Sequence, residues 1–104
     1  MNPQPKRSAY RNKKITQAAK GEDCALQWKY CNGNPETTVA AHLNELWAGK
    51  GGGQKSDDVP IFMCSSCHAD YDQGRMNSHL EKDWYLLRGL YRTIRILLDK
   101  GILQ

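Results

Sequence analysis

The stretch Met63-Cys-Ser-Ser-Cys-His-Ala-Asp-Tyr-Asp72 decides how the rest of this chain is interpreted. Cys64 and Cys67 are separated by two residues, the spacing at which a tight turn offers both thiolates to one metal ion. His68 follows at once, and its side chain must leave the turn in a different direction from that of Cys67. The stretch therefore predicts two sites, a closed structural metal beside an open working one.

The chain holds four cysteines, Cys24, Cys31, Cys64 and Cys67, which could form two disulfides or one four-thiolate metal site. No N-terminal apolar segment resembles a signal peptide, and no apolar run approaches the roughly 18 residues of a membrane span. Without export we expect a reducing compartment, which favours zinc over disulfides. A four-thiolate zinc has no open position, so its expected role is to stabilise the fold of a small domain.

Basic residues dominate the start of the chain, which has a formal net charge of +4. Between Met1 and Gly21 there are six basic residues and no acidic one. Such an arm attracts polyanions by releasing their counterions, although a solvated tail that only aids solubility has the same composition. The residues expected to contact a phosphate backbone are Lys6, Arg7, Arg11, Lys13 and Lys14 in this arm, with Lys50, Lys55 and Arg75 further along.

We expect residues 1–21 to form the basic arm and residues 22–104 to form one metal-stabilised domain. Within the arm, Ser8 or Asn12 can cap a short helix that Gly21 would end.

The domain then reads as strand, long glycine-bearing loop, strand and helix. Residues rich in β-branched side chains favour a strand over 37–42, which ends at His42, and a short apolar run favours a second strand over 59–63. Ser65 or Ser66 can cap the helix that follows and runs to about residue 73. This order places metal-type residues at the end of the first strand and at the start of the helix.

The last predicted element is an amphipathic helix over about 80–100. Apolar residues recur from Leu80 to Leu98 at spacings of four, three, four, three and four, which form the seam of such a helix. We expect this seam to pack on the metal-bearing core, and a monomer rather than a dimer, because one helix of this length carries little register information. The seam consists of Leu80, Trp84, Leu87, Tyr91, Ile94 and Leu98, and Leu86, Leu90 and Leu97 widen the apolar face.

Three residues remain for chemistry. His68 and Asp72 lie four residues apart, so on a helix they share one face and could hold a divalent cation with room for water and a phosphate oxygen. His42 could take the proton from an attacking water, because imidazole titrates near neutrality. Structural alternatives are a core histidine at 42 and a surface hydrogen bond between His68 and Asp72. His79 is expected at the surface.

Taken together, Ala-His (41–42), a glycine-bearing loop, an aspartate and Cys-x2-Cys-His resemble the HNH endonuclease superfamily. More narrowly, residues 31–39, 41–42 and 64–72 are similar to a family of short phage and prophage proteins regarded as HNH-like nucleases with no settled physiological role. This similarity covers about residues 8–100. It implies an α+β protein with a small ββα-metal core.

The resemblance also implies roles for individual residues. His42 corresponds to the general base, His68 to a metal ligand, and the four cysteines to the structural zinc site. Asp57, rather than the aspartate after it, occupies the neighbourhood of the asparagine that orients the loop in HNH enzymes. Many of those enzymes place a metal ligand immediately before the base, where this chain has Ala41. The catalytic ion would then need another carboxylate, from Asp57 or Asp72.

The function predicted is that of a metal-dependent endonuclease acting on DNA in phage DNA metabolism or recombination, with structural Zn²⁺ and a catalytic Mg²⁺ or similar ion. Because no helix carries a base-reading set of side chains, low or structure-based specificity is expected. The expected location is the cytoplasm of a phage-infected or lysogenic bacterial host, with no membrane partner. Alternatives are a non-catalytic zinc-stabilised nucleic-acid-binding module and a phage-encoded interaction protein that docks a recombination or replication partner.

Overall fold

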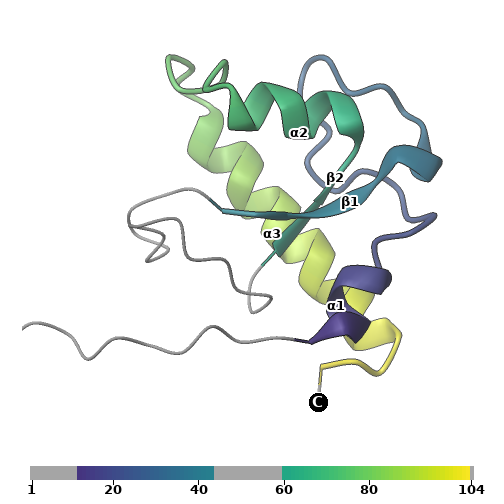
Figure 1. The fold of residues 1–104 in the computed structure, drawn as a ribbon. Coiled ribbons are helices and arrows are strands. Elements are labelled where there is room, and N and C mark those ends of the chain that lie inside the picture. Colours follow the sequence, from purple (N-terminus) through teal and green to yellow (C-terminus); the bar gives the residue numbers. More distant parts are fainter. Residues whose placement is uncertain (1–11, 44–59, 104) are drawn as a thin grey trace, which may run out of the picture.

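A computed structural model describes residues 12–43 and 60–103 (Figure 1). Two strands form an antiparallel pair, α2 follows the second strand almost directly, and a long C-terminal helix packs against that strand. The chain is thus a small α+β protein with a two-stranded sheet and three α-helices in its described part. The elements in chain order are α1 (Lys13–Gln17), the 3-10 turn η1 (Pro35–Thr37), β1 (Val39–His42), β2 (Pro60–Met63), α2 (Ser65–Asp72) and α3 (Lys82–Asp99).

The sheet begins later than the sequence predicts. The pairing runs from Val39 opposite Met63 to His42 opposite Pro60. A strand was expected from residue 37, but the side chain of Asn34 accepts a hydrogen bond from the Glu36 amide and starts the η1 turn instead. An asparagine followed by proline favours such a turn, so β1 is shorter than its β-branched residues suggest.

The second strand forms the centre of the core, because all four of its residues are buried. Its edge away from β1 is covered by other parts of the chain at Phe62. The Phe62 amide donates to the Thr93 hydroxyl of α3 over 3.0 Å, and the Phe62 carbonyl accepts from the Ala25 amide over 2.8 Å. The Thr93 hydroxyl in turn donates to the Gly89 carbonyl. An edge that would otherwise expose unpaired backbone groups is thereby satisfied.

A glycine lets α3 approach the strand closely. A Cβ atom at Gly89 would lie 2.8 Å from Ile61 Cγ2 and 3.4 Å from Leu26 Cα. No larger side chain fits there without movement of packed neighbours. Gly89 and Thr93 therefore define the face of α3 that meets β2, with Leu86 and Leu97 buried beside them.

The predicted seam of α3 does not pack on the core, so that prediction is wrong. The exposed fractions of the seam residues range from 38% at Ile94 to 99% at Leu80. Hydrophobic periodicity counts large apolar residues, whereas the contact with β2 depends on a glycine and on a threonine hydroxyl that such a count ignores. The apolar residues that were expected only to widen the face, Leu86 and Leu97, are the ones that are buried.

The helix ends follow from local hydrogen bonds. Asn12, one of two predicted caps of α1, accepts from the Lys14 amide, and Gly21 adopts the left-handed conformation (φ +77°) after that helix. Neither Ser65 nor Ser66 caps α2. Cys64 occupies that position, and its sulfur accepts from the Cys67 amide. Across residues 12–43 and 60–103, the helices all fall short of the length and apolar character needed to cross a membrane.

Replacing Thr93 by valine should destabilise the protein by about 1–3 kcal/mol, because the buried Phe62 amide would lose its acceptor at almost constant side-chain volume. Urea unfolding followed by circular dichroism would measure the change in the free energy of unfolding. Thr93→Ser is the matched control, since it keeps the hydroxyl and removes only a methyl group. A valine variant as stable as the wild type would contradict this account of the β2 edge.

Candidate functional site

The four cysteines meet at one point, as the sequence predicts. Their sulfur atoms all lie within 4.8 Å of one another, and none is in a disulfide. Two come from the loop that follows α1 and two from the start of α2, so the cluster joins parts of the chain more than 30 residues apart. Three of the four are buried and Cys31 is half-buried.

The spacing of the sulfurs fits a four-thiolate metal site. The Cys31 and Cys64 Sγ atoms are 3.7 Å apart. A disulfide would bring them to about 2.05 Å. The edge of a tetrahedron with metal–sulfur bonds of about 2.3 Å is about 3.8 Å, close to the observed separation. The donor set and its spacing therefore suit one tetrahedral ion of zinc type, which when bound would be held by these four residues.

Each half of the cluster contains the same kind of hydrogen bond, from a backbone amide to a cysteine sulfur. The Gln27 amide donates to Cys24 Sγ over 3.3 Å, and the Cys67 amide donates to Cys64 Sγ over 3.4 Å. In both cases the donor lies three residues after the acceptor. Gln27 adopts a left-handed backbone conformation (φ +49°), which a residue with a side chain rarely takes. Amide donors directed at sulfur favour the thiolate that a metal requires.

The thiols compete for protons. A hydrogen bond from the Cys67 thiol lowers the pKa of Cys24 to about 5. Burial raises the pKa of Cys31 to about 11. The hydrogen bond between the Cys67 thiol and Cys24 is also the main reason why the pKa of Cys67 is raised above its usual range. At neutral pH a metal that binds all four sulfurs must therefore displace at least the protons of Cys31 and Cys67.

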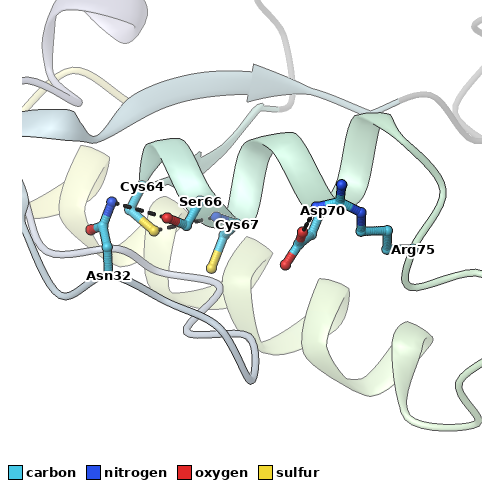
Figure 2. A network of polar contacts seen from close by, with 6 residues as sticks. All are labelled: Asn32, Cys64, Ser66, Cys67, Asp70 and Arg75. Carbon is cyan, nitrogen blue, oxygen red and sulfur yellow. Dashed lines mark hydrogen bonds and ion pairs between the residues drawn. The ribbon is translucent and has the colours of Figure 1, made fainter.

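An asparagine next to the cluster ties its two halves together. The Asn32 side-chain amide donates to Ser65 Oγ over 3.0 Å and to Ser66 Oγ over 3.4 Å, and Figure 2 shows it reaching towards the first turn of α2. Thr37 joins the same network, because its hydroxyl oxygen accepts from the Ser65 amide over 3.2 Å. No local pattern in the sequence indicates the distant serines as partners of Asn32.

The predicted His68–Asp72 pair forms on α2. His68 Nε2 lies 3.1 Å from Asp72 Oδ2, and the two side chains are 37% and 46% exposed. A nitrogen and an oxygen ligand are thus presented together at the surface, one turn apart. The pair as it stands also matches the structural alternative, in which the imidazole and the carboxylate satisfy each other.

His42 lies at the end of β1, as predicted, and is half-buried. Its ring Nδ1 is buried and has no hydrogen-bond partner. A buried ring nitrogen without a partner carries a free-energy cost, so it calls for an explanation, of which a role in a reaction is one.

The cysteine cluster is the one group of three or more metal-type side chains within ligand distance in the described residues. His42, His68 and Asp72 therefore do not form a second complete set there. Asp57, the predicted loop residue, lies outside the described residues. The same holds for five of the predicted backbone-contacting residues, Lys6, Arg7, Arg11, Lys50 and Lys55.

The three remaining basic candidates differ. Lys13 and Lys14 are exposed on α1. Arg75 forms an ion pair of 2.8 Å with Asp70, which is buried, so much of its charge is directed at its own chain (Figure 2). Burial of the Asp70 carboxylate was not predicted from the sequence. His79, expected at the surface, packs its ring edge-to-face on Trp28 with centroids 4.9 Å apart.

Relatives match nearly the whole chain. A family described as "Putative nuclease YbcO" matches residues 13–102. A protein of that name from Escherichia coli (strain K12) is 32% identical over 95 residues, which cover 86% of this chain and 96% of that protein. Enterobacteria phage 82 has a relative with the same name and the same figures. A solved structure of "a putative bacteriophage protein" from E. coli K-12 MG1655 has a TM-score of 0.59 at 32% identity and covers 83% of this chain and 98% of its own.

Removing one sulfur should abolish tight metal binding and much of the fold. Cys64→Ser would leave three thiolates and would also replace the cap of α2. We expect loss of the protein's cooperative unfolding transition, because metal binding free energy is folding free energy in small domains of this kind. Circular dichroism with and without a chelator would measure it. A wild-type protein that keeps its unfolding midpoint after complete metal removal would contradict a structural role for the cluster.

Metal affinity should rise steeply with pH. Because the pKa of Cys31 is raised to about 11 and that of Cys67 is also raised, both thiols are protonated near neutrality. Displacing at least two protons makes the affinity change by at least about 100-fold for each pH unit, with weaker binding at lower pH. Competition between the protein and a chromophoric chelator for Zn²⁺ at several pH values would measure the slope. A slope near zero would show that the thiols are already ionised.

Proposed function

Since this chain belongs to the family described as "Putative nuclease YbcO", we propose that it is a metal-dependent endonuclease that hydrolyses phosphodiester bonds in DNA. The observation that carries the proposal is His42. Its half-buried ring ends β1 and keeps a buried nitrogen without a partner. β1 pairs with β2, and β2 leads through the Cys64 turn into the helix that carries His68. The order of these parts is the one expected of a ββα-metal nuclease core.

The cysteine cluster would hold Zn²⁺ in a structural role. All four ligands come from the protein, so no position is left for water or substrate. The ion would fix the loop of residues 24–31 against the start of α2. That connection holds the first turn of α2 in place, and His68 follows the last cysteine directly.

The working ion would be Mg²⁺ or a similar divalent cation at His68 and Asp72. When bound, such an ion supplies positive charge that stabilises the leaving oxygen of a phosphodiester. Two protein ligands are fewer than such a site usually has, and Asp57 is the residue we propose as the third. Ala41, which precedes His42, is buried and offers no ligand.

His42 would act as the general base. A neutral imidazole can accept the proton from the attacking water. Backbone contacts would come from the basic arm, including the exposed Lys13 and Lys14, and would position DNA without reading its sequence. Low or structure-based specificity follows, in a bacterial cell during phage infection or lysogeny.

A second candidate function is a zinc-stabilised nucleic-acid-binding module without catalysis. The observation that favours it is the direct 3.1 Å contact between His68 and Asp72, because each side chain satisfies the other without a cation. The two functions share the structural metal and the basic arm. They differ in whether His42 and Asp72 affect strand cleavage.

Nicking of supercoiled plasmid in Mg²⁺ or Mn²⁺ separates the two functions. We expect His42→Ala to slow nicking by about 10²–10⁴-fold, the range associated with loss of a general base, with zinc content and fold unchanged. Asp72→Asn should also slow it by removing a ligand. Asp99→Asn is the matched control, because Asp99 also pairs with a basic residue four positions earlier, near the end of its own helix.

The assay has a clear negative result. Equal nicking by the wild type and His42→Ala, together with DNA binding that weakens as salt rises, would exclude the nuclease and support the binding module. If Asp99→Asn slowed nicking as much as Asp72→Asn does, loss of any carboxylate near a helix end would have the same effect, and Asp72 would not be identified as a metal ligand.

A further inference from the structure

The exposed stripe of α3 is a second apolar face on a helix that already has a buried one. The stripe comprises Trp84, Leu87, Tyr91, Ile94 and Leu98, and the exposed fractions of Leu87 and Tyr91 are 67% and 66%. Leu80, which the sequence places in the same series, precedes the helix, which begins at Lys82. With roughly 200 Å² for each large side chain, the exposed fractions of the five residues amount to on the order of 500 Å², so two copies would bury about 1,000 Å² together, the size at which specific protein interfaces begin. An exposed apolar face of this size is often functional.

The spacing of the stripe matches pairing with a second, identical helix. Its steps of three, four, three and four are those of the a and d positions of a heptad. The series from Trp84 to Ile94 also reads the same in both directions. When a second copy lies antiparallel, Trp84 faces Ile94 of that copy, and Leu87 faces Tyr91. The two aromatic residues, Trp84 and Tyr91, are then each opposite an aliphatic residue of the other copy.

The charges beside the stripe favour this antiparallel direction. Glu81 lies at the start of α3 and Arg95 near its end, on the same flank, 14 residues apart. An antiparallel pair brings Glu81 of one copy beside Arg95 of the other, twice, where Glu81 would share Arg95 with Asp99 of Arg95's own helix, 3.2 Å away. A parallel pair would bring the acidic helix starts, Glu81 and Asp83, together. Arg88 lies midway on that flank, but its guanidinium is held by the Leu26 carbonyl of its own chain over 3.0 Å.

We propose that the exposed stripe of α3 binds a second copy of this chain in an antiparallel, two-fold symmetric dimer. A two-fold axis requires a self-complementary surface, and a series that reads the same in both directions meets that requirement. This proposal differs from the expectation of a monomer, which rested on the little register information that one helix carries. The proposal does not depend on nuclease activity.

Sedimentation equilibrium of the full chain tests the proposal. The expected mass is twice the 11.8 kDa of one chain. Tyr91→Glu should raise the dimer dissociation constant at least about thirtyfold, because it places a charge in a central layer. Tyr30→Glu is the matched control, since Tyr30 is 62% exposed, lies beside Ser66 and Ala69 of α2, and should leave the dimer intact. Circular dichroism and metal content would confirm that both variants fold.

A charge exchange tests the direction of the helices. Glu81→Arg should weaken the dimer by about two- to fivefold, and adding Arg95→Glu should restore part of the loss. A second loss in the double variant would overturn the antiparallel arrangement. The whole proposal is overturned by a mass of 11.8 kDa at every concentration, or by a dimer that Tyr91→Glu leaves unchanged. Binding of the stripe by residues 1–11 or 44–59 of the same chain would give the first of these results.

Discussion

The convergence of four thiols is the interaction on which the rest of this structure depends. The sheet has two strands of four residues each, and such a hairpin is at best marginally stable by itself. The cysteines connect the loop of residues 24–31 to the turn between β2 and α2, and the network of Asn32 repeats that connection a few ångströms away. The fold is therefore set by a polar, metal-competent cluster as much as by its apolar core.

The same connection determines where the chemistry can occur. Cys64 caps α2 and Cys67 lies in its first turn, so the direction of this helix is fixed by the cluster. His68 and Asp72 then project one turn apart along a helix that cannot rotate without breaking the sulfur contacts. His42 is held separately, through the pairing of β1 with β2. The candidate ligands thus depend on the cluster directly, through α2. The candidate base depends on it indirectly, through β2, which leads into the Cys64 turn.

Much of this could be predicted from the sequence, and the failures share a cause. Cysteine spacing, the His68–Asp72 interval and the glycine after α1 are local signals, and each describes a geometry that neighbouring residues produce by themselves. Asn32, Asp70 and Thr93 are informative only through partners that lie elsewhere in the chain, so no local pattern identifies them. The capping of α2 was missed for a related reason, because cysteine is not counted among the usual capping residues although a thiolate can accept the same hydrogen bond.

The error over α3 has a more specific origin. Periodicity identifies an apolar face, but it cannot say which structure that face contacts when a helix has two of them. The core side of α3 approaches β2 closely at Gly89, and Thr93 replaces a missing strand by accepting the Phe62 amide. Such a contact requires a small residue and a hydroxyl where large apolar residues would not fit. The large residues consequently accumulate on the other side of the helix, and their regular spacing there must come from something other than this chain's core.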